Sequence, residues 1–159
     1  MLSADAHIGR RSFHGTKLVL FAGERVVLLR RDRKAWIPWP DRWDFPGGQR
    51  EPGESPVECV LRELEEETGL RLPVGRLERA RRVRGRWGHV WVFMARIGPR
   101  EVARLRLGDE GQCIVLMSPG RLVRDARRIS YQRRQMASLG LLRAGRGGTT
   151  VLQRRGVGG

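Results

Sequence analysis

Residues 55–69 have the sequence S-P-V-E-C-V-L-R-E-L-E-E-E-T-G, and both ends of this stretch carry signals for a single helix. Ser55 is a preferred N-cap residue, Pro56 suits the first helical position, and Glu58 completes a capping box three residues after the cap. Gly69 readily adopts the left-handed conformation that ends many helices. The sequence therefore predicts a helix that begins at the proline and ends just before the glycine.

The predicted helix, residues 56–68, has two distinct faces. Its apolar face follows the i, i+3, i+4, i+7 spacing of Val57, Val60, Leu61 and Leu64. Three carboxylates, Glu63, Glu66 and Glu67, share a second face about 120° around the helix. Like charges at this spacing repel each other, and hard oxygen ligands of this kind are what Mg²⁺, Mn²⁺ or Ca²⁺ accept. From the spacing alone, a divalent-metal site and a solvated acidic face are both open.

This helix and the turn before it resemble the Nudix hydrolase signature, G-x5-E-x7-R-E-U-x-E-E-x-G-U, where U is an aliphatic residue. Every restricted position is filled, by Gly48, Glu54, Arg62, Glu63, Leu64, Glu66, Glu67, Gly69 and Leu70. The preceding stretch, W-D-F-P-G-G-Q-R-E-P-G-E-S-P at residues 43–56, is similar to the approach to this signature in MutT-like members. The resemblance implies an α+β fold, an α-β-α sandwich in which a mixed, curved β-sheet lies between helices.

Short β-branched and leucine-rich runs outside the helix are compatible with such a sheet. They predict a hairpin and four further strands, at residues 17–21, 25–29, 43–46, 79–84, 89–97 and 113–117. A more helical stretch follows at about residues 121–142. We expect one domain at residues 17–143, with a loose leader at residues 1–16 and a mobile tail rich in glycine and arginine at residues 144–159.

The composition is that of a water-soluble globular protein. The chain has 159 residues, of which 40% are apolar and 31% charged, which excludes collagen-like, coiled-coil and low-complexity classes. The longest apolar runs, residues 18–22 and 26–29, are far shorter than the roughly 20 residues of a membrane span. The two cysteines lack C-x-x-C spacing, which argues against a disulfide scaffold or a zinc site. We expect a cytoplasmic protein that has no secretory signal and no membrane partner.

Arginine dominates a high positive charge. The formal net charge is +15, and 30 of the 32 basic residues are arginine. Residues 111–159 contain ten basic residues and one acidic residue, so the excess is concentrated near the C-terminal end. Such a charge attracts polyanions of every kind at low salt, including phosphorylated metabolites and nucleic acid, and does not choose among them.

The resemblance to the family implies a role for each matching residue. It makes Glu63, Glu66 and Glu67 catalytic metal ligands, with the carbonyl oxygen of Gly48 and the carboxylate of Glu54 as further ligands. The metal would be Mg²⁺, with Mn²⁺ as a substitute. Arg62 would hold the carboxylates in place, because a bidentate guanidinium fixes orientation as well as charge.

Other positions are expected to contact the substrate or to take up a proton. Family members commonly supply one more carboxylate from a loop, and Glu110 occupies the matching position, with Asp109 next to it. An exposed turn acid is the competing interpretation of Glu110. Arg30 and Arg31, at the end of the strand before the signature, are expected to hold a phosphate, and Gly47 is expected to lie against the substrate.

Tryptophans supply candidate contacts to a nucleobase. Trp87 and Trp91 lie near the expected cleft, and a base stacked on an aromatic ring gains roughly 1–3 kcal/mol. Trp36, Trp39 and Trp43 surround a proline-rich loop at residues 32–42 and form either an aromatic wall for a base or anchors that hold the loop to the core. Core packing is the competing interpretation for each of them.

The expected function is divalent-metal-dependent hydrolysis of a nucleoside diphosphate linked to another group, most simply a nucleoside triphosphate. Water attacks phosphorus, and a glutamate takes up its proton. Two alternatives stay open: hydrolysis of ADP-ribose or another nucleotide sugar, and an RNA-binding or RNA-5′-end-processing module that uses the arginine-rich C-terminal region. A homodimer is also expected, since dimers are frequent in the family and residues 89–97 offer an apolar strand edge. Asparagine is absent, so Gln49, Gln112, an acidic side chain or backbone groups would have to recognise a base in its place.

Overall fold

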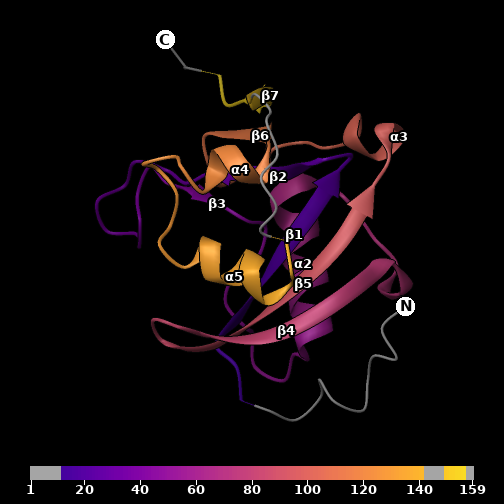
Figure 1. Ribbon diagram of the computed structural model, residues 1–159, viewed down its shortest axis with the longest axis vertical. Helices are drawn as coiled ribbons and strands as arrows, with labels where there is room; N and C mark the ends of the chain where they lie inside the picture. Colours follow the sequence, from indigo (N-terminus) through magenta and orange to yellow (C-terminus); the bar gives the residue numbers. More distant parts are fainter. Residues whose placement is uncertain (1–11, 142–148, 157–159) are drawn as a thin grey trace.

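A computed structural model describes residues 12–141 and 149–156 of the chain, and in this part a single mixed sheet forms the centre of the molecule (Figure 1). Its strands are β1 (Gly15–Ala22), β2 (Arg25–Arg30), β3 (Trp43–Asp44), β4 (Leu77–Gly85), β5 (Gly88–Ile97), β6 (Cys113–Met117) and β7 (Thr149–Arg154). The order across the sheet is β4-β5-β1-β2-β6-β7, with β3 paired to β2. Among the described pairs, β1 and β5 are parallel and the others are antiparallel. The mixed sheet expected from the sequence is confirmed.

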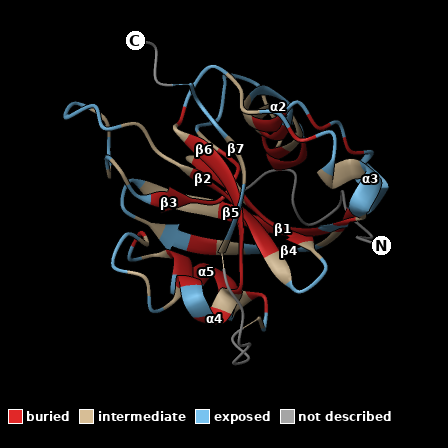
Figure 2. Cartoon of the chain, turned by 90° about the horizontal axis from the view of Figure 1, so that it is seen from above, coloured by how far each residue is buried: buried red, intermediate tan, exposed pale blue. Residues whose placement is uncertain are grey.

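Helices cover both faces of this sheet, which gives the expected layered architecture (Figure 2). Helix α2 (Pro56–Thr68) lies on one face, and α4 (Pro119–Leu122) and α5 (Gln132–Ser138) lie on the other. A short helix, α3 (Pro99–Val102), follows β5, and a 3-10 turn at Val74–Arg76 precedes β4. Within the described residues, no helix is both long enough and apolar enough to cross a bilayer.

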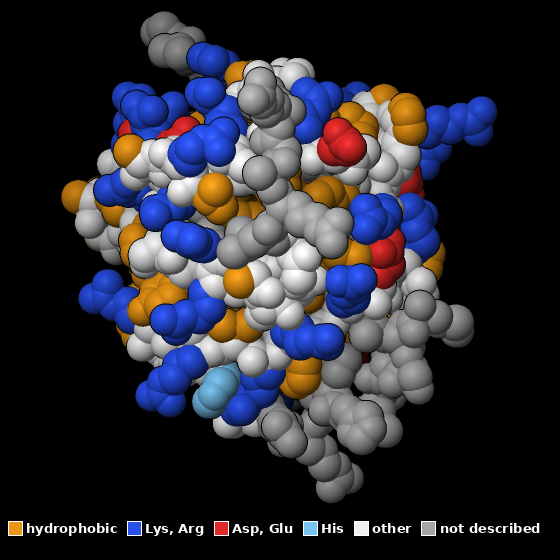
Figure 3. All heavy atoms as spheres, in the orientation of Figure 1, with side chains coloured by type: hydrophobic (Ala, Val, Ile, Leu, Met, Phe, Trp, Pro, Cys, Tyr) orange, Lys and Arg blue, Asp and Glu red, His pale blue; other side chains and the backbone are white. Residues whose placement is uncertain are grey.

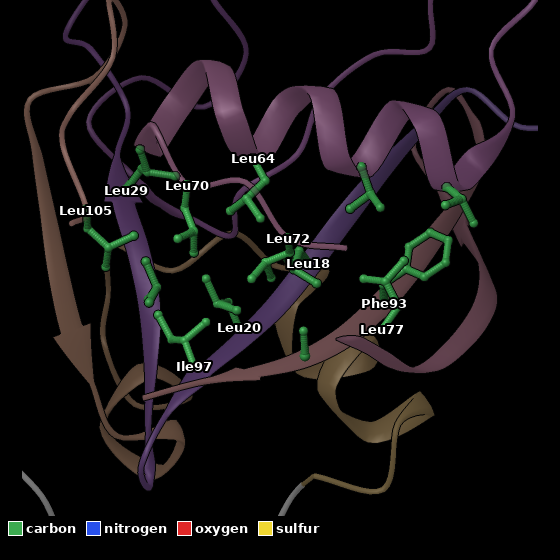
Figure 4. Packing of buried hydrophobic residues seen from close by; sticks show 14 of the residues in the cluster. Leu18, Leu20, Leu29, Leu64, Leu70, Leu72, Leu77, Phe93, Ile97 and Leu105 are labelled. Carbon is green, nitrogen blue, oxygen red and sulfur yellow. The ribbon is translucent and has the colours of Figure 1, made fainter. Parts of the chain in front are cut away.

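Strand alternation divides the core into two clusters, one on each face of the sheet. In β1, Leu18 and Leu20 point toward α2, whereas Val19 and Phe21 point toward α4 and α5. The α2 side is a dense aliphatic layer in which Leu64 packs against the strands (Figure 4). Because both faces of β1 are buried, its position is fixed, and so is the position of the loop that pairs with its first residues.

Helix α2 has the ends that its sequence predicts. The Ser55 hydroxyl accepts a hydrogen bond from the Glu58 N–H at 3.2 Å, and the Glu58 carboxylate accepts one from the Ser55 N–H at 2.7 Å. Gly69 has a φ of 68°, in the left-handed region, and its N–H donates to the Glu65 carbonyl at 2.8 Å. The predicted bounds, residues 56–68, are confirmed.

The helical stretch expected at residues 121–142 is interrupted. The chain leaves the helical conformation between α4 and α5, where the Asp125 carboxylate accepts a hydrogen bond from the Arg127 N–H at 2.8 Å. Such a local side-chain bond offers the backbone a turn in place of a helix. Gln132 then supports the start of α5, because its side-chain oxygen accepts from the Ile129 N–H at 3.0 Å.

Two expectations about the chain ends need correction. β1 begins at Gly15, inside the expected leader, since its N-terminal end pairs with the loop before α2. In the tail expected to be mobile, Thr149–Arg154 form β7, which pairs with β6. β-branched Thr149, Thr150 and Val151 favour a strand, and the open edge of β6 supplies backbone partners. Residues 1–11, 142–148 and 157–159 lie outside the described part.

The strand edge expected to support a dimer is not an edge. β5 lies between β4 and β1 and is paired along both sides. Its run of apolar residues reflects burial on both faces of the sheet. The argument for a homodimer through residues 89–97 is therefore wrong.

Candidate active site

Gly47 and Gly48 connect β3 to the loop before α2, and the structure leaves no room for a side chain at either position. The β1 backbone holds this turn, since the Thr16 N–H donates to the Gly48 carbonyl at 2.9 Å. Gly47 has a φ of 135°, and a Cβ there would lie 2.2 Å from the Thr16 carbonyl oxygen. A Cβ on Gly48 would lie 2.4 Å from Oε1 of Glu63. The carboxylate of Glu63 therefore packs directly against the Gly48 backbone.

Arg62 connects three carboxylates of the signature. Its Nε and Nη2 form a bidentate pair with Glu54 at 2.5 and 3.1 Å. Its Nη1 donates to Glu63 at 3.1 Å and to Glu66 at 3.0 Å. Nη2 also donates to the Gln49 carbonyl at 3.0 Å, which ties helix α2 to the loop before it. Hydrogen bonding from Arg62 holds the pKa of Glu54 below its ordinary value.

Replacing Arg62 by lysine is expected to lower kcat and Mn²⁺ affinity by roughly ten- to a hundredfold, as loss of outer-shell partners of metal ligands does. Lysine keeps the charge but cannot make a bidentate pair. Arg71→Lys is the matched control, because Arg71 is 82% exposed and pairs with Glu65 on the solvent side of the same helix. Steady-state kinetics and Mn²⁺ titration check this, and an equal loss in both variants would contradict the positioning role of Arg62.

Glu67 lies partly buried against the glycine turn. Its Oε2 accepts a hydrogen bond from the Gly47 N–H at 2.8 Å. Burial raises the pKa of Glu67 to about 8, although the Lys17 charge and the bond from Gly47 act in the opposite direction. Burial also raises the pKa of Glu63 above its ordinary value, against the opposing charge of Arg62. The positive groups of the chain therefore do not fully offset the cost of negative charge at these two carboxylates.

Lys17 and Arg31 meet at Asp44 beside these glutamates. The Lys17 Nζ lies 2.7 Å from Oδ2 of Asp44 and donates to the Gly47 carbonyl at 3.2 Å. Nη1 of Arg31 lies 3.1 Å from the same carboxylate oxygen. Asp44 is buried, so the two cations are fixed next to the glycine turn.

The donor set suits a hard divalent cation. Glu63, Glu66 and Glu67 supply carboxylate oxygens from one helix, the Glu63 carboxylate lies against Gly48, and buried carboxylates with raised pKa values are stabilised by a nearby cation. As the side chains stand in the described residues, no three His, Cys, Asp or Glu side chains are grouped to hold a metal ion. Nη1 of Arg62 lies among the carboxylates instead, and Glu63 and Glu66 would have to leave it in order to hold an ion.

A family model of the NUDIX domain matches residues 14–139, a range that contains every residue of the site described above. This chain belongs to the Nudix family.

Two curated relatives share segments of this Nudix domain. m7GpppN-mRNA hydrolase NUDT17 of Xenopus laevis is 44% identical over 64 residues, which is 40% of this chain and 22% of that protein. Diphosphoinositol polyphosphate phosphohydrolase 3-alpha of Homo sapiens is 49% identical over 54 residues, which is 34% of this chain and 30% of that protein. The matched segments therefore span less than a third of either relative.

Solved structures support the Nudix fold. The MutT protein of Methanosarcina mazei has a TM-score of 0.61 at 24% identity, over 77% of this chain and 88% of that chain. An Ap4A hydrolase of C. elegans has a TM-score of 0.63 at 18% identity, over 79% of this chain and 95% of that chain. At these identities the likeness concerns the fold alone.

The remaining acidic candidate lies at the edge of the Nudix site. Glu110 is exposed in the loop before β6 and lines a cavity together with Glu67. Asp109 is exposed in the same loop and does not line that cavity. The structure thus brings one loop carboxylate to the buried glutamate of α2.

The two expected phosphate-binding arginines differ in their surroundings. Arg31 faces the glycine turn through Asp44, as described above. Arg30 points to the other face of the sheet, where its guanidinium lies 2.8 Å from Asp41 and 5.6 Å from the centre of the Trp43 ring. A hydrogen bond from Arg30 lowers the pKa of Asp41 to about 2. Arg30 therefore supports the loop at residues 32–42, in addition to lining the cavity that contains Glu67.

Trp87 and Trp91 differ in burial. Trp91 is 7% exposed and packs with Phe93 in the core beneath α2, so the expectation that it contacts substrate is wrong. Strand alternation puts Trp91 on the same face as Phe93 and not on that of Val90, which lines the pocket near the glycine turn, whereas Trp87 lies outside both strands. Trp87, in the β4–β5 turn, is half exposed and lines that pocket.

Lys17 and Asp44 are site residues that the sequence interpretation did not identify. Lys17 is one of two lysines in a chain with thirty arginines, and this rarity could have marked it as a candidate site residue. Asp44 directly precedes the F-P-G-G turn, but an aspartate before a turn is too common to indicate a site. Their proximity arises from β1 pairing and is not encoded by local spacing.

Proposed function

We propose that this protein is a divalent-metal-dependent hydrolase that cleaves a phosphoric anhydride in a nucleotide substrate. The observation that carries this proposal is the arrangement of Glu63 and Glu67 against the Gly47–Gly48 turn, with Arg62 fixing the carboxylates. Hydrolysis of a nucleoside diphosphate linked to a group X yields a nucleoside monophosphate and X-phosphate.

Glu63, Glu66 and Glu67 would hold the metal, with Glu54 and the Gly48 carbonyl as further donors. When bound, Mg²⁺ or Mn²⁺ would neutralise phosphate charge and lower the pKa of a coordinated water, so that hydroxide is available near neutral pH. The chain itself contributes the positions of these ligands. Arg62 keeps the carboxylates on one face of α2 through its bonds to Glu54, Glu63 and Glu66.

Two cations and two carboxylates of the chain act on the substrate. Lys17 and Arg31 neutralise phosphate oxygens beside the glycine turn, since both are partly exposed next to Asp44. Glu67 and Glu110 are the candidate general bases, because they line one cavity and a general base must lie within hydrogen-bond reach of the attacking water. Glu67 is partly buried and held by the Gly47 N–H, whereas Glu110 is on an exposed loop.

A second candidate function is the processing of RNA 5′ ends. A groove on the other side of the sheet is lined by six arginines, Arg30, Arg33, Arg121, Arg127, Arg154 and Arg155. Basic side chains are also scattered over the face seen in Figure 3, with few acidic side chains among them. The groove shares Arg30, Asp32 and Gly111 with the cavity that contains Glu67. An RNA whose 5′ end enters that cavity could therefore place its following phosphates against the arginines of the groove.

A substrate panel with Mg²⁺ and with Mn²⁺ tests the proposal. It contains nucleoside triphosphates, dinucleoside polyphosphates, ADP-ribose, a diphosphoinositol polyphosphate and a 5′-triphosphorylated RNA oligonucleotide. We expect metal-dependent release of a nucleoside monophosphate from at least one nucleotide. If a folded protein cleaves none of these compounds with either metal, the proposed function is wrong. A turnover of the RNA that exceeds that of mononucleotides, and that falls steeply with salt, would favour the second candidate.

A further inference from the structure

The groove lined by six arginines is built in part by the C-terminal strand of the described chain. Its walls come from β2, β6, β7, α4 and the connection after α4, and it encloses about 530 Å³. β7 lies beyond residues 14–139, the range that the family model matches. The groove is therefore a feature that this chain adds to the Nudix domain.

The six arginines of the groove fall into two groups. Arg30 and Arg33 are already paired, since both lie within 3.3 Å of the Asp41 carboxylate. Arg155 donates through its Nε to the Gly111 carbonyl at 3.0 Å. The side chains of the other three are exposed and make no hydrogen bond or ion pair with any residue that the structure describes: Arg121, Arg127 and Arg154. These three guanidinium groups are available to a ligand, and none of them lines the cavity that contains Glu67.

Two aspartates in the lining do not neutralise these three arginines. Asp32 pairs instead with Lys34, 3.4 Å away. The Asp125 carboxylate accepts a hydrogen bond from the backbone N–H of Arg127 at 2.8 Å and forms no ion pair within the described part of the chain. Asp125 therefore offsets at most one of the three free cations, and positive charge remains in excess.

Two other residues of the groove wall have polar atoms without a partner. Nε1 of Trp43 and Oγ1 of Thr149 are buried and find no hydrogen-bond partner among the described residues. Both groups can donate a hydrogen bond, and buried donors of this kind are usually paired with protein, water or ligand. An anion with several oxygens supplies acceptors, whereas a cation supplies none.

The shape of the lining favours phosphates without bases. Trp43 is the only aromatic residue among the described residues that line the groove, and it is 8% exposed. A single-stranded nucleic acid gains much of its affinity from bases stacked on exposed rings, and this lining offers no such ring. Guanidinium groups, by contrast, bind phosphate oxygens strongly and in a bidentate manner.

We propose that this groove binds a compact polyphosphorylated anion, a short chain of linked phosphates, at a site distinct from the proposed metal site. Arg121, Arg127 and Arg154 would contact its phosphate oxygens. The inference does not depend on the proposed function, because it requires neither a metal ion nor hydrolysis.

Binding of inorganic triphosphate to the full chain, measured by calorimetry in the presence of EDTA, tests the inference. Without a divalent cation, the carboxylates of the Nudix site repel phosphates. We expect triphosphate to bind more tightly than pyrophosphate, and pyrophosphate more tightly than orthophosphate. Three substitutions should each weaken triphosphate binding by roughly tenfold, as the loss of a hydrogen bond to a charged group does: Arg121→Ala, Arg127→Ala and Arg154→Ala.

Arg124→Ala is the matched control, because Arg124 follows α4, is exposed and does not line the groove. It removes the same charge and should change the affinity by less than a factor of about two, since exposed charges outside the groove are screened by salt. Equal losses in Arg124→Ala and Arg154→Ala would show that the net charge of +15 attracts the anion diffusely, and would overturn the inference.

Two other results would also overturn it. Binding that appears only when Mg²⁺ is added, and that does not depend on the three arginines, would assign triphosphate to the Nudix site. Tighter binding of a single-stranded RNA with a 5′-hydroxyl end than of triphosphate, with the same dependence on the three arginines, would identify the groove as a nucleic-acid surface.

Discussion

Replacing Glu67 by glutamine is expected to lower kcat for anhydride hydrolysis by roughly a hundred- to ten-thousandfold, the usual contribution of a positioned general base or more. Glutamine has the same shape and still accepts a hydrogen bond from the Gly47 N–H, but it carries no charge for a cation and takes up no proton. The thermal unfolding midpoint should not fall, because the substitution removes a carboxylate whose charged form is disfavoured by desolvation. Steady-state kinetics with Mg²⁺, together with thermal melts, measure both effects.

Glu65→Gln is the matched control for this substitution. Glu65 lies on the same helix, is exposed, and pairs with the exposed Arg71. Its replacement should leave kcat within a factor of about two, since exposed ion pairs contribute little. A Glu67→Gln variant with turnover like that of Glu65→Gln would show that the buried glutamate takes no part in the chemistry.

Gly47→Ala is expected to reduce the free energy of unfolding by about 3 kcal/mol, from backbone strain and from overpacking. At a φ of 135°, an alanine is strained, and its Cβ would lie 2.2 Å from the Thr16 carbonyl oxygen and 2.8 Å from the Lys17 Cα. Those atoms belong to β1, which is buried on both faces and does not move easily. Urea unfolding monitored by circular dichroism measures the loss.

Substitutions at two other glycines distinguish the cost of backbone strain from the cost of steric overlap. Gly53 has a φ of 82° and open space around its Cβ position, so Gly53→Ala should cost about 1 kcal/mol from conformation alone. Gly75 has neither a positive φ nor a close neighbour, and Gly75→Ala should be neutral. If Gly47→Ala costs no more than Gly53→Ala, the β1 backbone does not confine the glycine turn in the way described.

Local sequence signals were sufficient to predict the elements around the Nudix signature. Helix α2 carries its own caps and its own apolar stripe, so its bounds follow from the sequence of residues 55–69. The β1–β2 hairpin follows in the same way, since two β-branched runs flank a short turn at Gly23. Interactions within a few residues decide both elements, and these are the interactions that a sequence pattern records.

Long-range contacts decided the features that the sequence did not reveal. Trp91 and Trp87 both occupy the β4–β5 hairpin, yet only the pairing of β5 with β1 shows that Trp91 is under α2. β7 forms because β6 has an open edge, and the three β-branched residues at its start do not by themselves reveal that long-range pairing. The juxtaposition of Trp39, Trp87 and Tyr131 likewise requires three distant segments to meet.

The most direct test of the account is a crystal of the protein with Mn²⁺ and a nucleotide whose anhydride oxygen is replaced by a methylene group. We predict anomalous density for Mn²⁺ in contact with the carboxylates of Glu63 and Glu67 and with the phosphates of the nucleotide, and Glu63 turned away from Arg62. Density for Mn²⁺ elsewhere, with Glu63 still bound to Arg62 and Glu67 contacting only the Gly47 N–H, would contradict the metal site on which the proposed chemistry rests.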